Sequence, residues 1–251
     1  MDNINLLHGD CLELMGDIPD GSVDMILTDP PYGVTRCGWD VAPHLGLLWG
    51  EYERIIKPNG CIAIFAGEPF SAALIMSNLK LYRYELVWKK EIHSDFLNAH
   101  RKPLKIHDKI QVFYKRQPVY HPQKTSAAPY KRVAAQRKTE CYGYMKPYET
   151  KNGVTERYPT TVLEFNREVG IHPTQKPVPL LCWLIRSYTD EGDMILDPFM
   201  GSGSTGVACI REGRRFIGME REEKYFEIAR RRLKEARERG LQKVCDPEET
   251  E

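Results

Sequence analysis

Val23-Asp24-Met25-Ile26-Leu27-Thr28-Asp29-Pro30-Pro31-Tyr32-Gly33 is an apolar run that ends in an acid, two prolines and an aromatic residue. Its apolar part consists mostly of branched and long side chains, which is typical of a parallel strand that is covered on both faces. Neither proline can donate a backbone hydrogen bond, so the strand must end there. The stretch therefore predicts an α/β fold with Asp29 at the carboxyl edge of the sheet, where open α/β sheets bind ligands.

Asp29, Pro30, Pro31 and Tyr32 carry the groups that methyl transfer to the exocyclic amine of a base requires. The lone pair of such an amine is delocalised into the ring, and two hydrogen-bond acceptors can draw the nitrogen toward tetrahedral geometry. The Asp29 carboxylate can accept one N–H, and the Pro30 carbonyl, which Pro31 stiffens, can accept the other. Tyr32 can stack on a base that has swung out of its helix. We interpret the four residues as catalytic; the alternative is a proline-rich turn with an aspartate cap.

A second motif is Met194-Ile195-Leu196-Asp197-Pro198-Phe199-Met200-Gly201-Ser202-Gly203-Ser204-Thr205-Gly206, again a short apolar strand that runs into a loop, here rich in glycine. A ligand can approach the backbone closely in such a loop. Residues 215–220 repeat the pattern, and the last of them, Glu220, is placed to bind a ribose diol. The glycines match the G-x-G-x-x-G spacing of dinucleotide-binding folds, so glycine spacing alone leaves both a nicotinamide cofactor and S-adenosylmethionine open.

Together these motifs resemble the amino-methyltransferases of DNA that use S-adenosylmethionine. Asp29–Tyr32 resembles their catalytic motif and Asp197–Gly203 their cofactor loop, while His172–Pro177 is similar to a third segment, which lines the methionine end of the cofactor. The order of catalytic motif, long insert and cofactor loop is similar to the beta class, a circular permutation of the usual methyltransferase chain. The resemblance covers residues 4–115 and 170–235.

The resemblance implies a Rossmann-like methyltransferase fold, circularly permuted, with a mostly parallel sheet, an antiparallel edge strand and a basic target-recognition insert. Residues 1–115 would form the catalytic half, 116–170 the insert, 171–240 the cofactor-binding half, and 241–251 an acidic tail that is predicted to be disordered. The residues implied to bind S-adenosylmethionine are Asp10, Thr174, Lys176, Asp197, Phe199, Gly201, Gly203, Ser204, Thr205 and Glu220. For Asp10 a helix N-cap is an equally good interpretation.

The middle of the chain is strongly basic. Residues 89–167 hold 17 Lys and Arg against 7 Asp and Glu, a formal charge of +10, whereas the rest of the chain, with 19 against 28, carries −9. Tyrosines are interleaved with these cations and there is little periodicity, which indicates a nucleic-acid surface rather than a solvated charged loop. We predict double-stranded DNA as the partner. The candidate DNA-binding residues are Arg36, Trp39, Lys89, Lys90, Arg101, Lys102, Lys124, Lys131, Arg132, Arg137 and Lys138.

Two loops are predicted beside the catalytic edge. Residues 33–40 are expected to close over the target nucleotide, with Arg36 near phosphate and Trp39 either filling the space left by the flipped base or anchoring the loop in the core. Residues 84–88 and 109–114 are predicted strands of a hairpin-like pair. Between them, Lys89–Lys105 is predicted to be a polar, mobile loop.

Composition bounds the remaining possibilities. The seven cysteines are scattered without a Cys-x-x-Cys pair, which indicates reduced thiols and no metal site. There is no charged-then-apolar leader and no run near 18 apolar residues, so we expect a cytoplasmic protein without a membrane span. The resemblance leaves two further partners open, a second copy of the chain and a cognate restriction endonuclease.

We predict that the chain transfers a methyl group from S-adenosylmethionine to adenine N6 of a flipped-out base in DNA, by direct in-line displacement. Asp29 favours adenine, because cytosine-N4 members of the resembled family more often begin the motif with serine; cytosine N4 is the alternative. A nicotinamide-dependent oxidoreductase would leave Asp29–Tyr32 and the basic insert unexplained. A methylase of protein glutamine or RNA would have the reverse motif order, and a non-catalytic DNA-binding module would bind DNA without methyl transfer.

Overall fold

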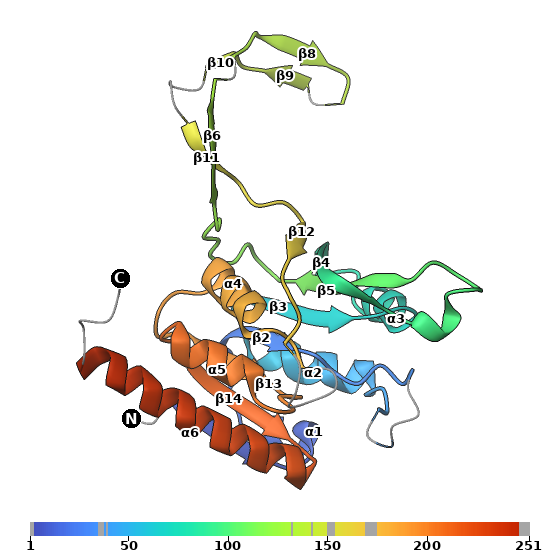
Figure 1. The fold of residues 1–251 in the computed structure, drawn as a ribbon, viewed down its shortest axis with the longest axis vertical. Coiled ribbons are helices and arrows are strands. Elements are labelled where there is room, and N and C mark those ends of the chain that lie inside the picture. Colours follow the sequence, from blue (N-terminus) through green and yellow to red (C-terminus); the bar gives the residue numbers. More distant parts are fainter. Residues whose placement is uncertain are drawn as a thin grey trace. The chain divides into compact units, whose positions relative to one another are not determined.

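The computed structural model describes residues 3–34, 38, 40–131, 133–141, 143–149, 154–168 and 175–245. The chain forms two compact units, Met1–His121 with Thr161–Glu251, and Pro122–Thr160. The larger unit contains the central sheet and its helices, and the smaller unit consists of short strand pairs (Figure 1).

An eight-stranded sheet in the order β1-β14-β13-β2-β3-β5-β4-β12 is the centre of the larger unit. Its strands are β1 (Ile4–His8), β2 (Val23–Thr28), β3 (Ile56–Ala66), β4 (Tyr82–Ser94), β5 (Lys105–Phe113), β12 (Val162–Glu164), β13 (Met194–Asp197) and β14 (Arg215–Glu220). Within the described sheet, β5 is the one strand that runs antiparallel to its neighbours, so the prediction of a mostly parallel α/β sheet is confirmed.

The predicted edge position of the antiparallel strand is wrong. β5 lies between β3 and β4, and the edge strand β12 pairs in parallel with β4. The sequence indicates that β4 and β5 form a pair, but it does not indicate which of the two joins the rest of the sheet. Ile110, Val112 and Phe113 of β5 are fully buried, as suits a strand that is covered on both faces of the sheet.

Two apolar cores cover opposite faces of the sheet, because side chains alternate along each strand. On β3, Ala63 and Phe65 pack in the core that contains helices α4 (Val178–Tyr188), α5 (Ser204–Arg211) and α6 (Glu223–Cys245). Ile62 and Ile64 face the other way, toward α1 (Cys11–Met15), α2 (Leu45–Ile55) and α3 (Phe70–Ser77). The larger unit is therefore a three-layer α/β structure (Figure 1).

The segment after Trp88 is a hairpin rather than the predicted polar loop. β4 continues to Ser94, which pairs with Lys105 at the start of β5, so residues 95–104 alone connect the two strands. The connection contains a short 3-10 helix, η1 (Phe96–Asn98). Polar composition hides these strands because a two-stranded ribbon is held by backbone hydrogen bonds and by cross-strand ion pairs such as that between Lys90 and Asp108.

The smaller unit is built from three antiparallel pairs. β6 (Thr125–Tyr130) pairs with β11 (Val154–Arg157), β7 (Val133–Ala134) with β10 (Tyr148–Glu149), and β8 (Arg137–Thr139) with β9 (Gly143–Met145). None of its side chains whose burial is described is buried. This unit therefore has no apolar core among those side chains, which explains why the sequence shows little periodicity there.

The C-terminal helix extends into the segment that was predicted to be a disordered tail. α6 continues to Cys245, so the tail predicted to be disordered from residue 241 is helical through residue 245, and residues 246–251 lie outside the described part. Among the described residues, no helix combines the length and the apolar character that crossing a bilayer would need.

Candidate active site

A cavity of about 710 Å³ lies at the carboxyl ends of the parallel strands. Residues that follow β1, β2, β13 and β14 line it, as the edge of an open α/β sheet predicts. The predicted site residues among its lining are Asp10, Asp29, Pro30, Pro31, Tyr32, Lys176, Asp197, Phe199, Gly201, Ser204, Thr205 and Glu220. Thr174, which was predicted with them, lies outside the described residues.

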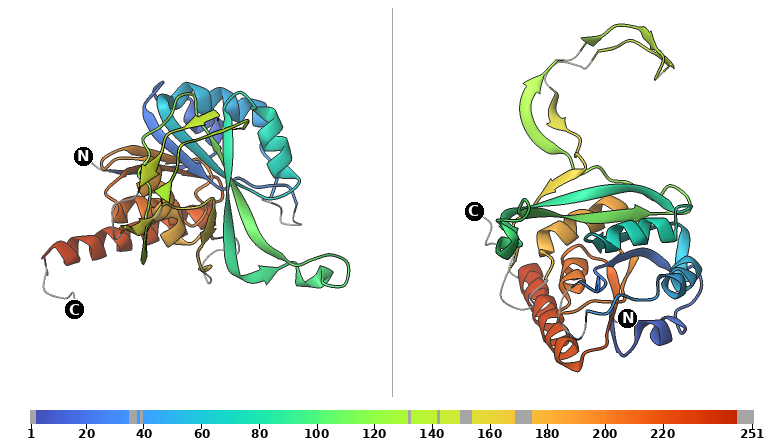
Figure 2. Two further views of the ribbon diagram at one scale, coloured as in Figure 1. Left: turned by 90° about the horizontal axis from the view of Figure 1, so that it is seen from above. Right: turned by 90° about the vertical axis from the view of Figure 1, so that its right-hand side faces the viewer.

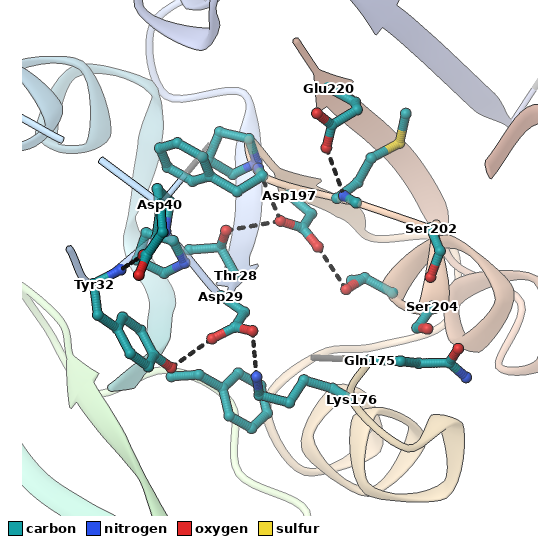
Figure 3. A pocket seen from close by; sticks show the side chains of 18 of the residues that line it. Thr28, Asp29, Tyr32, Asp40, Gln175, Lys176, Asp197, Ser202, Ser204 and Glu220 are labelled. Carbon is teal, nitrogen blue, oxygen red and sulfur yellow. Dashed lines mark hydrogen bonds and ion pairs between the residues drawn. The ribbon is translucent and has the colours of Figure 1, made fainter. Parts of the chain in front are cut away.

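The Asp29 carboxylate lies directly after β2, at the end of the cavity that holds the predicted catalytic motif (Figure 3). Its Oδ1 accepts a hydrogen bond of 2.5 Å from the Tyr32 hydroxyl, and its Oδ2 contacts the Lys176 ammonium. Burial and the neighbouring Asp29 charge raise the pKa of Tyr32 well above its usual value, so this hydroxyl stays a donor. The Tyr32 ring stacks on Phe70, with centroids 5.3 Å apart and planes inclined by 20°.

Lys176 was predicted to bind the cofactor, but its ammonium lies on Asp29 and over the Phe65 ring, 5.0 Å from the centroid. The ion pair joins residues that are 147 positions apart in the chain. No local sequence signal connects them. The segment that resembles the methionine-end motif is therefore joined to the catalytic loop through this pair.

Asp40 was not predicted as a functional residue, yet it holds in place the loop that follows β2, which contains the predicted catalytic motif. Its carboxylate accepts backbone N–H groups of Tyr32 at 2.8 Å, Gly33 at 2.9 Å and Val34 at 3.0 Å. Gly33 adopts φ +69°, a conformation that favours glycine. The only sequence signal for this role of Asp40 is its position, seven residues after the Tyr32-Gly33 pair. The predicted contacts of Arg36 and Trp39 fall outside the described residues.

Asp197 joins the two halves of the cavity floor. It is buried, and it accepts hydrogen bonds from the Thr28 hydroxyl at 2.7 Å, the Thr205 hydroxyl at 2.6 Å and the Phe199 N–H at 3.1 Å (Figure 3). Burial raises the pKa of Asp197 to about 6, although these donors act in the opposite direction. The carboxylate thus links β2, β13 and the start of α5, and Thr28 is a partner that sequence reasoning missed.

The acids predicted at the cofactor end lie at the cavity wall. Glu220 accepts N–H groups from Gly201 at 3.0 Å and Glu222 at 2.8 Å, and burial raises its pKa. Asp10 is the N-cap of α1 and accepts the Leu12 N–H at 2.9 Å. Each carboxylate oxygen has a second acceptor position, so both side chains can also bind ligand hydroxyl or amine groups.

The glycine-rich loop divides into a ligand face and a packing face. Gly201 has φ +51°, and a Cβ there would meet nothing within 4 Å. Gly203, which is not among the described lining residues, has φ +80°, and its Cβ would lie 2.7 Å from Leu233 and 2.9 Å from Ala229 of α6. Gly203 therefore serves close packing against α6, whereas Gly201 leaves room for a ligand.

A second charged cluster lines the cavity beside the hairpin. Asp108 makes ion pairs with Lys90 at 2.5 Å and with Lys105 at 2.6 Å. Burial alone would raise the pKa of Asp108, but the two ammonium groups lower it to about 2. Burial lowers the pKa of Lys90. Asp108 is a cavity residue that sequence reasoning missed.

The predicted DNA-binding residues fall into two groups. Lys89, Lys90, Arg101 and Lys102 lie on the hairpin of the larger unit, and Lys124, Lys131, Arg137 and Lys138 belong to the smaller unit. Several are engaged by acids: Lys89 with Glu164, Lys102 with Asp95, and Lys124 with Glu156. Arg132 lies outside the described residues.

The fold and the cavity together define a Rossmann-like methyltransferase, with a glycine-rich loop after one strand, an acid after the next and Asp29–Tyr32 opposite them. Residues 23–231 match the model of the N6/N4 methyltransferase family, described as DNA methylase, so the chain belongs to that family. These findings confirm the predicted class, a DNA methyltransferase that uses S-adenosylmethionine.

Two relatives are type II methyltransferases. M2.DpnII of Streptococcus pneumoniae is 29% identical over 257 aligned residues, which cover 91% of this chain and 88% of the relative. M2.LlaDCHI of Lactococcus lactis subsp. cremoris is 29% identical over 269 aligned residues, which cover 96% and 93%.

Two solved structures share the fold. The M1.HpyAVI–SAM complex has a TM-score of 0.62 and 27% identity, with 92% of this chain and 100% of that chain covered. PvuII DNA methyltransferase, described as cytosine-N4-specific, has a TM-score of 0.66 at 14% identity, with 96% and 95% covered. The second likeness shows the fold alone.

Proposed function

We propose that this DNA methyltransferase methylates adenine N6 at a short specific site in double-stranded DNA, and that it acts on a base flipped into the cavity. The observation that carries the proposal is the Asp29 carboxylate at the cavity edge, with Tyr32 and Lys176 holding its two oxygens. A duplex hides the exocyclic amine, so the base must leave the stack to reach this carboxylate.

The cofactor end of the cavity fits S-adenosylmethionine. A volume of about 710 Å³ is within the range of small-molecule sites. The open face of Gly201 admits close approach of a ligand, and Glu220 offers acceptor positions for a ribose diol. When bound, S-adenosylmethionine supplies an electrophilic methyl group on sulfur.

At the catalytic end, Asp29 orients the amine. Its oxygens hold more acceptor positions than Tyr32 and Lys176 use, so one can accept an amine N–H. The Pro30 carbonyl is the second acceptor, since the residue that follows it is also proline. Tyr32 has one ring face against Phe70, which leaves the other for stacking on the base. Holding the amine beside the methyl donor supplies the proximity that in-line displacement needs.

We favour adenine over cytosine as the acceptor base because the motif begins with aspartate, whereas the motif of cytosine-N4 members of the family more often begins with serine. The fold does not distinguish the two acceptors, because PvuII DNA methyltransferase, described as cytosine-N4-specific, has the same fold. Cytosine N4 is therefore the second candidate. The Pro122–Thr160 unit is our candidate for target recognition; its basic composition and its lack of buried side chains among those described support this role.

The circular permutation, a homodimer, a cognate restriction endonuclease and a cytoplasmic location remain predictions from the sequence. Size-exclusion chromatography with light scattering would test the dimer.

The test is incubation of the purified protein with labelled S-adenosylmethionine and unmethylated genomic DNA, followed by nucleoside analysis and single-molecule sequencing. We expect N6-methyladenine at one short motif. Methylated N4 of cytosine would overturn the acceptor and keep the class. The absence of any labelled base, with cofactor binding shown by calorimetry, would overturn the DNA substrate.

A further inference from the structure

The β4–β5 hairpin carries two large apolar side chains at its end. Phe96 is 70% exposed and Leu97 is 83% exposed, and both belong to η1. We call Phe96 and Leu97 the hairpin tip. The hairpin projects beyond the rest of the central sheet (Figure 2).

The tip is held by a defined set of contacts. Asp95, which precedes it, adopts φ +69°, an uncommon conformation for a residue other than glycine. Its carboxylate accepts from the Asn98 amide at 2.6 Å and pairs with Lys102 at 2.5 Å. Backbone hydrogen bonds from Asn98 to Asp95 and from Arg101 to Asn98 close the turn. A turn built in this way exposes Phe96 and Leu97 by its geometry, which indicates a surface for a partner.

The position and charge of the hairpin identify the kind of partner. Ser94 and Lys105, the pair at which its strands end, line the same cavity as Asp29. Arg101 is exposed and makes no ion pair within the part of the chain that the structure describes. Apolar side chains beside an exposed arginine, next to the proposed site for a flipped base, suit a duplex that is opened at one step.

We propose that Phe96 and Leu97 form a wedge that enters the base stack beside the target nucleotide, which rests on the proposed function. Extrusion of a base leaves a gap that costs stacking energy. An aromatic and an aliphatic side chain inserted there replace the lost contacts, while Arg101 neutralises a neighbouring phosphate. The wedge thereby keeps the extruded base in the cavity, in reach of Asp29.

The experiment compares two duplexes that contain the methylation motif found by sequencing. In one the target base has its normal partner, and in the other it faces an abasic position, so that extrusion is already easy. The double variant Phe96→Ala/Leu97→Ala is compared with the wild type and with Met76→Ala. Met76 is a matched control because it is 68% exposed on α3 and does not line the cavity.

We expect kcat/KM of the double variant to fall about 10- to 100-fold on the normal duplex and less than about threefold on the abasic duplex. Met76→Ala should match the wild type on both. An equal loss on the two duplexes, or no loss, would overturn the wedge. So would a changed sedimentation coefficient of the double variant without DNA, since the tip would then bind a second copy. Wild-type protein that methylates neither duplex would overturn the proposed function as well.

Discussion

The internal contacts of the larger unit differ in kind from the internal contacts of the smaller unit. In the larger unit, Asp197 and Asp40 each accept three hydrogen bonds and fix the loops around the cavity. In the smaller unit no side chain with described burial is buried, and surface contacts such as Arg157 over the Tyr130 ring, at 3.7 Å, join the strands. The groups that we propose to be catalytic are therefore preorganised, as electrostatic catalysis requires. The described side chains of the smaller unit form no such framework, which agrees with the proposed role in target recognition, since such a surface can adapt to its partner.

The largest effect is expected at the preorganised carboxylate. Asp29→Ala removes the acceptor that orients the amine, and we expect kcat to fall about 10³-fold. Radiometric methyl transfer on the identified motif measures this loss. Affinity for S-adenosylmethionine, measured by calorimetry, should change less than about twofold, because Asp29 acts on the base. Turnover near the wild-type rate would refute the assignment of the site.

The next effect concerns Asp197, whose raised pKa makes folding depend on pH. In the unfolded chain this carboxyl titrates near its usual value of 3.8, whereas in the folded protein it titrates near 6. The folded state therefore binds the proton of Asp197 more tightly than the unfolded chain does. The stability that this protonation contributes is fully present below about pH 4 and is lost as pH rises through 6. The loss amounts to about 3 kcal/mol.

Asp197→Asn removes this titration and should make the free energy of unfolding less dependent on pH. Urea unfolding of both proteins at pH 4.5 and pH 7.5 is the measurement, and slopes shared with other carboxyl groups cancel in the comparison. The same change of unfolding free energy with pH in both proteins would show that Asp197 is not the titrating group.

A smaller effect is expected at Asp40. Asp40→Ala leaves three backbone N–H groups of the catalytic loop without their acceptor, which should lower the free energy of unfolding by about 2 kcal/mol. Because Tyr32 is among them, kcat should fall as well, while the affinity for S-adenosylmethionine is kept. Asp40→Asn retains one acceptor oxygen and should lie between the wild type and Asp40→Ala. If Asp40→Ala lowers stability and leaves kcat unchanged, Asp40 does not position Tyr32.

The predictions that succeeded depend on patterns within one segment. An apolar run that ends in Asp-Pro-Pro-Tyr, and another that ends in a glycine-rich loop, placed Asp29 and Asp197 at one sheet edge, because parallel strands end at the same edge. The apolar spacing of α4 (Val178–Tyr188) and the turn that follows it are signals of the same local kind.

The features that were missed depend on contacts between distant segments. The Lys176–Asp29 pair and the Thr28–Asp197 hydrogen bond join residues 147 and 169 positions apart. The internal position of β5 depends on which side of a hairpin meets β3, which composition does not encode. The hairpin tip was assigned to a polar loop, because the exposure of Phe96 and Leu97 depends on the turn around Asp95 and not on composition.

The smallest effect on the fold, and the sharpest test of the comparison, is expected in the smaller unit. Arg137→Gln/Lys138→Gln alters exposed cations on β8, and the free energy of unfolding should stay within about 0.5 kcal/mol of the wild type. If both residues contact phosphate, DNA affinity should fall and the slope of log K against log salt should decrease by about 2. Fluorescence anisotropy over a salt series measures both quantities. Arg230→Gln/Lys234→Gln on α6 is the matched control, because it removes the same charge from the larger unit. An equal loss of DNA affinity in the control would show that the effect comes from net charge alone. Unchanged binding by the β8 variant would mean that Arg137 and Lys138 do not contact DNA.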